Sequence, residues 1–319
     1  MKRRNKILLI ILGIVLILFI GILLFKHSLK PTYKGEIELP TLENEVNVYY
    51  DTFGIPHIYA ASQREAFMAL GYVHAQDRLW QMELLRRVAR GGLSEVFGPD
   101  LIPTDKFFLS LGIDDASSRT LGAIDRRDTT FLLAQAYLDG INEFLEKGPT
   151  PVEFMLTGIE KEPFTMRDIY NSVGYMAFTF AQAHKTDPLL TEVKNTLGPA
   201  YLEDLQIDVD PETEFIQNYN GNSALSLEEN LLGHVNNALE KLPIPQFEGS
   251  NSWVIAPQKT KSGKVLFAND PHIGFAQPSV WYEAHLTAPG YEKYGYYLGG
   301  IPFPMLAHDR KMAYGMTMF

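Results

Sequence analysis

The chain contains no cysteine among its 319 residues. This absence excludes disulfide bonds, thiolate metal sites and a cysteine nucleophile, so stability must come from packing or from a metal held by other ligands. Basic residues are also in the minority, because 28 Lys and Arg face 38 Asp and Glu and leave a net charge of −10. Outside the N-terminus they form no long basic cluster, which argues against nucleic acid as a partner.

The chain has enough apolar residues to form a sizeable core, since 46% of its residues are hydrophobic and 21% are charged. The most apolar part follows a basic start, Met1 to Lys6, and consists of residues 7–25, which are only Ile, Leu, Val, Phe and Gly. Nineteen residues rising about 1.5 Å each nearly span a hydrocarbon core of about 30 Å.

A secretory signal usually has a shorter apolar region, of about 7–15 residues, followed by a small-residue cleavage site. Residues 26–30 offer no such site. We therefore expect residues 1–30 to form an uncleaved signal anchor in the membrane, with its basic end in the cytoplasm and the rest of the chain on the extracytoplasmic face. A cleaved signal peptide and secretion remain the alternative.

Residues 31–45 mix Pro, Gly, Lys and Glu without a sustained period, which predicts a tether between membrane and domain. Structure is expected to begin at residue 46, because residues 46–50 alternate as a strand, residues 51–54 form a turn and residues 55–60 extend again. This pattern predicts a hairpin.

Three helices are predicted from their capping residues, and they begin at Ser62, at Asp128 or Thr129, and at Thr165. The first is long, ends at Gly91, and contains His74, Asp77 and Arg78. Charged residues flanked by apolar positions on a helix more often form structural pairs than catalytic sites, so we interpret these three as structural.

The junction Gly249–Ser250 separates two kinds of sequence. Pro243 and Pro245 predict an extended, accessible connector before it, and residues 252–256 predict a half-buried strand after it. A serine in such a turn is ordinary unless the preceding peptide bond breaks. If it does, Ser250 gains a free α-amino group, with a reference pKa of about 7.7–8.0, beside its own hydroxyl.

Seven stretches together carry a family resemblance: residues 54–60, 71–83, 250–256, 262–264, 268–272, 278–283 and 315–317. In this order they resemble the two chains of the penicillin acylases, which are N-terminal-nucleophile amidohydrolases. The resemblance implies an α+β fold, a partial αββα sandwich with a helical small-chain region and an N-terminal membrane helix. It divides the chain into a small-chain region, 46–216, a spacer removed by self-cleavage, 217–249, and the start of the catalytic chain, 250–319.

The same resemblance assigns the chemistry. Cleavage at Gly249–Ser250 would make Ser250 the nucleophile and its α-amino group, acting through a water, the base. His272 falls where relatives that act on aliphatic or dicarboxylic acyl groups place an assisting histidine. The backbone N–H of Met318, after the Gly-x-Thr turn at residue 315, would be one oxyanion donor. We also expect Asp77 and Arg78 to hold the two chains together.

Further residues take expected roles from the resemblance. Four residues are expected to line the acyl pocket: Phe178, Phe180, Ile273 and Leu306. For each of them, packing in the core is the alternative. The aliphatic pair, Ile273 and Leu306, suggests a straighter or longer acyl chain than phenylacetyl. Asp187, with Glu192 as runner-up, is expected to bind a structural calcium ion. No organic cofactor is expected, and the substrate is a small N-acyl amide of the β-lactam or acyl-homoserine-lactone class.

The resemblance also implies parts that lie past Phe319, namely a second oxyanion donor and the acidic residue that orients His272. We therefore expect the 319-residue chain to be a truncated acylase with little amidase activity of its own. The rival reading is a catalytically inactive, membrane-anchored acylase-like fragment. A conventional Ser–His–Asp hydrolase using Ser250 in the intact chain is disfavoured, because no nucleophile-elbow motif supports it.

Overall fold

The computed structural model describes residues 3–181, 183–205, 241–242 and 247–317, so most of the predicted spacer lies outside the described residues. The helices are α1 Arg3–Ser28, α2 Gln63–Arg90, α3 Ser94–Phe97, α4 Ile102–Leu111, α5 Ile113–Ala123, α6 Thr129–Lys147, α7 Val152–Thr157, α8 Met166–Phe180, α9 Ala183–Leu197 and α10 Ala200–Asp204. The strands are β1 Asn47–Tyr50, β2 Pro56–Tyr59, β3 Phe247–Ile255, β4 Leu266–Ile273, β5 Trp281–Ala288, β6 Tyr291–Leu298, β7 Leu306–His308 and β8 Ala313–Tyr314.

The long helix α2 begins and ends where its sequence signals predict. The Ser62 side chain accepts the backbone N–H of Glu65, and the Glu65 carboxylate accepts the Ser62 hydroxyl at 3.0 Å. Gly91 ends the helix in the left-handed conformation, with φ 67°. The helix also has a kink that the sequence did not predict. It lies at Arg78, whose backbone angles are non-helical. The predicted caps of α6, Asp128, and α8, Thr165, are confirmed.

Helices α2 and α6 cross at two glycines. A Cβ added to Gly71 would lie 1.9 Å from the Tyr137 carbonyl oxygen, and one added to Gly140 would lie 1.9 Å from the Met68 carbonyl oxygen. No larger residue fits this approach of backbone to backbone without moving a helix. The crossing brings α2 and α6 together into one layer.

That layer covers one face of a six-stranded sheet with the order β1-β2-β5-β6-β7-β8. Alternate residues of the strands, such as Ile58, Ala284 and Leu286, are fully buried in the same apolar cluster as Phe67 and Tyr137 of the two helices. β1 and β2 form the predicted hairpin, and β2 pairs in parallel with β5. The sheet therefore joins segments that precede and follow Ser250.

Two side chains of α2 reinforce this connection. Asp77 accepts a hydrogen bond from the Tyr282 hydroxyl at 2.9 Å, and Arg78 Nη1 donates to the Ser279 carbonyl at 2.7 Å. The expectation that Asp77 and Arg78 link the two parts of the chain is confirmed. His74 is structural, as interpreted, because its fully buried ring stacks on Tyr282 and its Nδ1 lies 2.8 Å from the Tyr137 hydroxyl.

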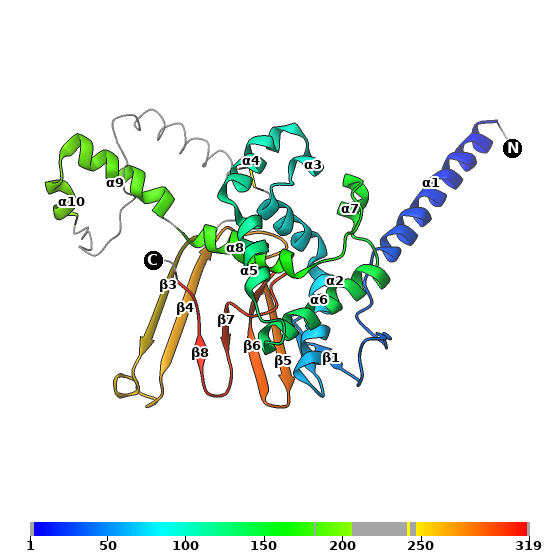
Figure 1. Cartoon of the computed structure of the whole chain (residues 1–319). Coiled ribbons are helices and arrows are strands. Elements are labelled where there is room, and N and C mark those ends of the chain that lie inside the picture. Colours follow the sequence, from blue (N-terminus) through cyan, green and yellow to red (C-terminus); the bar gives the residue numbers. More distant parts are fainter. Residues whose placement is uncertain (1–2, 182, 206–240, 243–246, 318–319) are drawn as a thin grey trace.

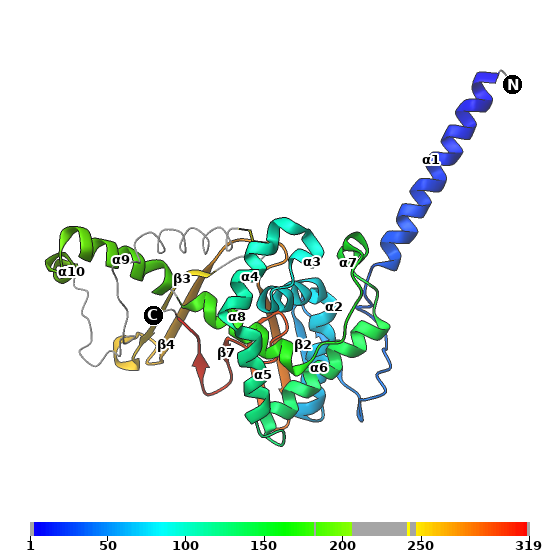
Figure 2. The same ribbon diagram turned by 45° about the horizontal axis from the view of Figure 1, so that its top comes forward.

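The tether forms no helix or strand, but it is fastened to the helical layer. The Tyr33 hydroxyl donates to Asp77 at 2.5 Å, and the backbone N–H of Asn44 donates to Glu65 at 2.9 Å. In contrast, α1 projects away from the body and carries the N-terminus at its far end (Figures 1 and 2). Its residues Ile10–Ser28 are long and apolar enough to span a membrane, and none of that span is buried.

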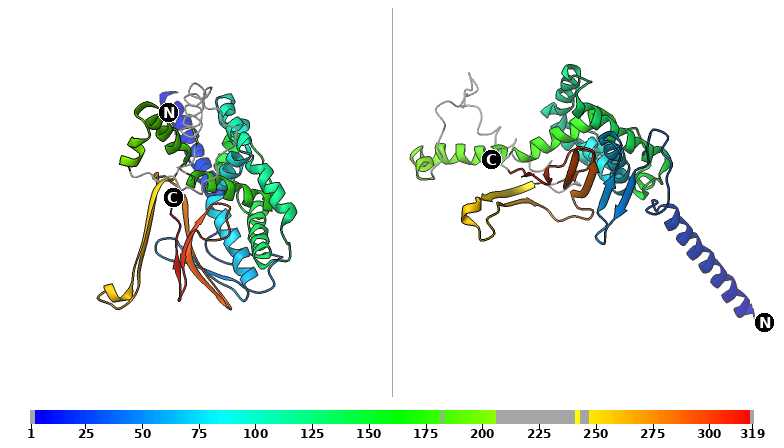
Figure 3. Two further views of the ribbon diagram at one scale, coloured as in Figure 1. Left: turned by 60° about the vertical axis from the view of Figure 1, so that its left-hand side comes forward. Right: turned by 90° about the horizontal axis from the view of Figure 1, so that it is seen from below.

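Strands β3 and β4 form a separate antiparallel ribbon, which stands apart from the six-stranded sheet (Figure 3). The predicted strand after Ser250 is present. It is less buried than expected, because the exposed fractions of Trp253 and Val254 are 51% and 64%. The chain is thus of mixed helix and sheet: a helical layer covers one main sheet, the ribbon β3–β4 stands beside it, and α1 projects from the body.

Candidate active site

Ser250 lies in β3, opposite Pro271 of β4. Gly249 precedes it and pairs with His272, and the register shifts between Phe247 and Gly249, which marks a β-bulge. Bulges re-aim side chains and interrupt pairing, and they occur often beside active sites. The Gly249–Ser250 bond is therefore adjacent to an irregular point of the ladder, and both residues are partly exposed.

The Ser250 side chain contacts Thr317. Their hydroxyl oxygens are 2.8 Å apart, and Thr317 Oγ1 also lies 3.3 Å from the Ser250 carbonyl oxygen. When Thr317 donates its only hydrogen to that carbonyl, the Ser250 hydroxyl donates to Thr317. This arrangement fixes the rotamer of the Ser250 side chain.

Asn269 of β4 holds the Thr317 segment against the ribbon. Its amide nitrogen donates to the carbonyls of Asn251, at 3.1 Å, and Met316, at 3.0 Å. A Cβ on Gly315 would lie 1.9 Å from Asn269 Oδ1, so only glycine allows the turn to approach this side chain. The glycine, the threonine and the asparagine therefore place the Ser250 hydroxyl as one unit.

His272 lies close to the Gly249–Ser250 bond but faces the other side of the ladder. Paired residues in neighbouring strands project to the same face, so His272 shares a face with Gly249 and Ser250 projects opposite. His272 Nε2 lies 3.0 Å from Asp270 Oδ2 and 3.3 Å from Asn251 Nδ2. The chain thus supplies its own acidic partner for His272, in contrast to the expectation from the sequence. The assisting role of His272 stays a prediction.

Met318 lies outside the described residues, so its role as oxyanion donor stays a prediction. The four residues predicted for the acyl pocket do not lie in one cluster. Phe180 and Ile273 pack against one apolar cluster of Met176, Val280, Leu298 and Ile301. Phe178 instead contacts the rings of Phe107 and Phe108 in a second cluster. Leu306 is buried in β7.

Asp187 and Glu192, the predicted calcium ligands, are both exposed residues of α9. They are five positions apart, whereas side chains three or four apart share a helix face. Within the described residues, no group of three or more His, Asp or Glu is arranged to hold a metal ion. The calcium ion stays a prediction.

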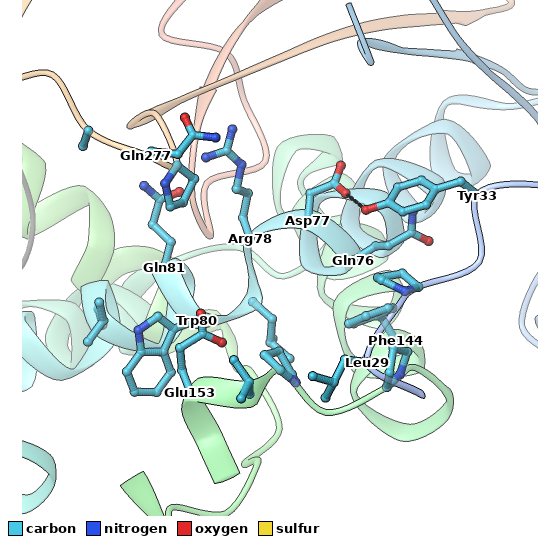
Figure 4. Close-up of a pocket in the computed structure, with 18 of the residues that line it drawn as sticks. Leu29, Tyr33, Gln76, Asp77, Arg78, Trp80, Gln81, Phe144, Glu153 and Gln277 are labelled. Carbon is cyan, nitrogen blue, oxygen red and sulfur yellow. Dashed lines mark hydrogen bonds between the residues drawn. The ribbon is translucent and has the colours of Figure 1, made fainter. Parts of the chain in front are cut away.

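The large pockets of the described chain lie elsewhere, on either side of Asp77 and Arg78. One, of about 750 Å³, is lined by both of these residues, by Trp80 and Phe144, and by Leu29 at the end of α1 (Figure 4). Burial raises the pKa of Asp77, and the hydrogen bonds from Tyr33 and Tyr282 partly oppose this effect. The residues that line this pocket do not include Ser250, so we assign it no part in the chemistry.

Comparisons with known proteins agree on one family. The penicillin amidase family model matches residues 45–319. The chain is 33% identical over 303 residues to penicillin acylase 2 proenzyme of Pseudomonas sp. (strain SE83), an alignment that covers 90% of this chain and 38% of that protein. It is 29% identical over 301 residues to acyl-homoserine lactone acylase QuiP of Pseudomonas aeruginosa, covering 92% and 35%.

It is also 28% identical to penicillin G acylase of Escherichia coli over 331 residues, covering 86% of this chain and 39% of that protein. Among solved structures, the thermostable penicillin G acylase from Alcaligenes faecalis in tetragonal form matches with a TM-score of 0.43 and 26% identity, over 54% of this chain and 96% of that one. The chain belongs to the penicillin amidase family. It spans 35 to 39% of the length of these curated relatives.

Proposed function

We propose that the chain is an acylase precursor in which the Gly249–Ser250 bond is cleaved and Ser250 becomes the nucleophile of an N-acyl amide hydrolase. The observation that carries the proposal is the hydroxyl of Ser250, positioned 2.8 Å from Thr317 Oγ1 beside a β-bulge. The family match, whose named members are acylases, supports the same chemistry.

The cleavage step needs only groups at this site and water. The Ser250 hydroxyl attacks the Gly249 carbonyl carbon, and its proton leaves through the hydrogen bond to Thr317. The C–N bond breaks, the same proton passes through water to the Ser250 nitrogen, and an ester links Gly249 to Ser250 Oγ. Water then hydrolyses the ester, which leaves a carboxylate on Gly249 and a free α-amino group on Ser250.

In the second stage the α-amino group, acting through a water, takes the proton of the Ser250 hydroxyl as this oxygen attacks the substrate amide. The amine leaves, an acyl ester forms on Ser250, and water releases the acid. The Met318 backbone N–H is proposed to stabilise the oxyanion. His272, oriented by Asp270, is proposed to assist from beside Gly249.

For the acyl group we propose an aliphatic chain. Phe180 and Ile273 pack against a cluster whose other members include Met176, Val280, Leu298 and Ile301, and an unbranched chain suits such apolar surroundings. This preference agrees with the relatives named as acyl-homoserine lactone acylases. Little amidase activity is expected of the 319 residues alone, but hydrolysis of an N-octanoyl amide should exceed that of its phenylacetyl counterpart, and the reverse order would contradict the preference.

We propose three further properties of the protein. The fold is a partial αββα sandwich of the N-terminal-nucleophile hydrolases, with the ribbon β3–β4 in its second sheet. Residues 10–28 anchor the chain in a membrane with the folded part on the extracytoplasmic face, or act as a secretion signal. Asp187 contributes to a calcium site.

The test is cleavage of the full chain after expression, followed by gel electrophoresis and intact mass. The wild type should give two fragments, and Ser250→Ala should remain a single chain. Ser252→Ala, an exposed serine in the same strand, is the matched control and should be cleaved like the wild type. An uncleaved wild type would favour the non-catalytic acylase-like protein instead.

A further inference from the structure

Four side chains form a row across the face of the main sheet that is opposite the helices. Register pairs His57 of β2 with His285 of β5, His285 with Tyr294 of β6, and Tyr294 with His308 of β7. Register partners share a face. The neighbouring residues Ile58, Ala284 and Leu286 are buried against the helices, so the row lies on the other side.

Within this row, two imidazole rings face each other with their Nδ1 atoms. The Nδ1 atoms of His57 and His285 are 3.1 Å apart. Both side chains are sheltered, with exposed fractions of 26% and 14%. The rings of Tyr59 and Tyr294 flank the pair.

The other nitrogen of each ring faces a carboxylate. His57 Nε2 lies 3.7 Å from Asp51 Oδ2. His285 Nε2 lies 3.6 Å from Glu292 Oε1 and 3.4 Å from the Thr287 hydroxyl oxygen. Arg310 Nη2, 2.7 Å from the same Glu292 oxygen, holds that carboxylate in place. A carboxylate favours the tautomer with hydrogen on the nitrogen that it faces. Hydrogen on Nε2 lets each ring face its carboxylate, and the Thr287 hydroxyl can accept from that nitrogen of His285.

This tautomer leaves a lone pair on each Nδ1, and two lone pairs 3.1 Å apart repel unless a cation lies between them. A transition-metal ion meets this requirement. Two metal–nitrogen bonds of about 2.0–2.1 Å span the observed separation at an angle of about 100°, close to tetrahedral. Histidine ligands whose second N–H faces a carboxylate are also the usual pattern at metal centres.

We propose that His57 and His285 bind one divalent transition-metal ion, of the Zn²⁺ class, through their Nδ1 atoms, with Asp51 and Glu292 orienting the two rings. Neutral imidazole suits Zn²⁺, Cu²⁺ and Ni²⁺ and does not suit Ca²⁺. The described residues offer no third His, Asp or Glu at this point, so water completes the coordination.

The ion would join β2 to β5, and so the segment before Ser250 to the segment after it. It would therefore stabilise the parallel strand pair that connects the two parts of the sheet. The site does not depend on cleavage at Ser250. Failure of the metal proposal is read from metal binding and failure of the proposed function from fragment masses, so the two are distinguishable.

The experiment is calorimetric titration of ZnCl₂ into the full chain, prepared without a histidine tag and first treated with EDTA. The wild type should bind one equivalent that both His57→Gln and His285→Gln lose. The matched control His308→Gln, in the same row, should keep it. Thermal unfolding of each variant in EDTA shows whether it folds.

A second variant protects the test against misfolding. Glu292→Gln keeps both ligands and should weaken Zn²⁺ binding about 10- to 100-fold, as loss of an orienting carboxylate typically does. The proposal is overturned if the wild type binds no Zn²⁺, or if the bound equivalent survives both histidine substitutions. In either case the pair holds a shared proton in place of a metal.

Discussion

Ser250 and Thr317 are 67 residues apart in the sequence, and their hydroxyl oxygens are in hydrogen-bond contact. The contact sets the direction in which the Ser250 oxygen points, and Thr317 also reaches the carbonyl of the same residue. A hydroxyl that both orients the Ser250 oxygen and accepts its hydrogen bond should matter most in the proposed attack on the Gly249–Ser250 peptide bond.

Thr317→Val therefore tests the positioning of Ser250. Valine keeps the shape of threonine and removes the two hydrogen bonds, and the loss of about 1.4 kcal/mol corresponds to about tenfold slower cleavage. The half-life of the uncleaved chain, followed by gel electrophoresis, gives the rate. Thr287→Val, in β5, should cleave at the wild-type rate; equal rates in all three proteins would refute a role for Thr317.

The sequence identifies Ser250 through motifs, but it does not show the partners of Ser250. Thr317 could not be assigned to the serine, because their contact depends on how the segment after β8 lies along the ribbon. The contact between Asp270 and His272 could have been predicted, because residues two apart in a strand share a face and Asp270 precedes His272 by two positions. The side of the ladder that His272 occupies follows only from the register of β3 and β4.

At the scale of elements, the crossing of α2 and α6 depends on Gly71 and Gly140. Gly140→Ala should lower the free energy of unfolding by about 3 kcal/mol, because the added methyl group overlaps a backbone carbonyl of α2. Gly122→Ala in α5, where the new methyl group meets nothing within 4 Å, should be neutral or slightly stabilising. Urea unfolding compares them, and similar values for the two variants would contradict this packing.

The turn between β7 and β8, which leads to Gly315 and Thr317, is held by Asp309. Hydrogen bonding from Lys293, at 2.7 Å, and from the backbone N–H groups of Lys311 and Met312 lowers the pKa of Asp309. A carboxyl with a lowered folded-state pKa adds stability above its unfolded pKa of about 3.9, and this stability is lost as the pH falls through the folded value.

Asp309→Asn should therefore be less stable than the wild type at neutral pH, and the difference should shrink as the solution is acidified well below the unfolded pKa. Urea unfolding of both proteins, at neutral pH and in acid, measures this difference in stability. A double-mutant cycle with Lys293→Met isolates the pair, and the coupling should vanish in acid. A difference independent of pH would show that Asp309 acts without its charge.

Local signals placed the ends of the long helices but not the segment between α2 and α6. The caps at Ser62, Asp128 and Thr165 begin three helices as predicted, because capping is decided within a few residues. The short helices α4 and α5 had no such signal. The kink at Arg78 is equally invisible in the sequence, since this side chain reaches Ser279, which lies 201 residues further on.

At the scale of the whole molecule, the parts before and after Ser250 are packed into one sheet and one core. β2 pairs with β5, and the Tyr282 hydroxyl donates to Asp77 of α2 and lies 3.3 Å from the Val73 carbonyl oxygen. A break at Gly249–Ser250 would leave these contacts intact. The two fragments are therefore expected to elute together in size-exclusion chromatography under native conditions.

The apolar helix α1 gives a second expectation at this scale. If residues 10–28 span a membrane, the full chain should stay in the membrane pellet after alkaline carbonate extraction, and a chain that starts after Ser28 should be soluble. Release of the full chain into the supernatant would show that this helix is not a membrane anchor.

The central claim is that Ser250 becomes an N-terminal residue, and sequencing the N-termini of the purified protein tests it most directly. The account predicts a new N-terminus that reads Ser250, Asn251, Ser252, Trp253 and Val254, and predicts its absence from Ser250→Ala. A wild-type protein that keeps the Gly249–Ser250 bond, or that is cut only at another position, would contradict it.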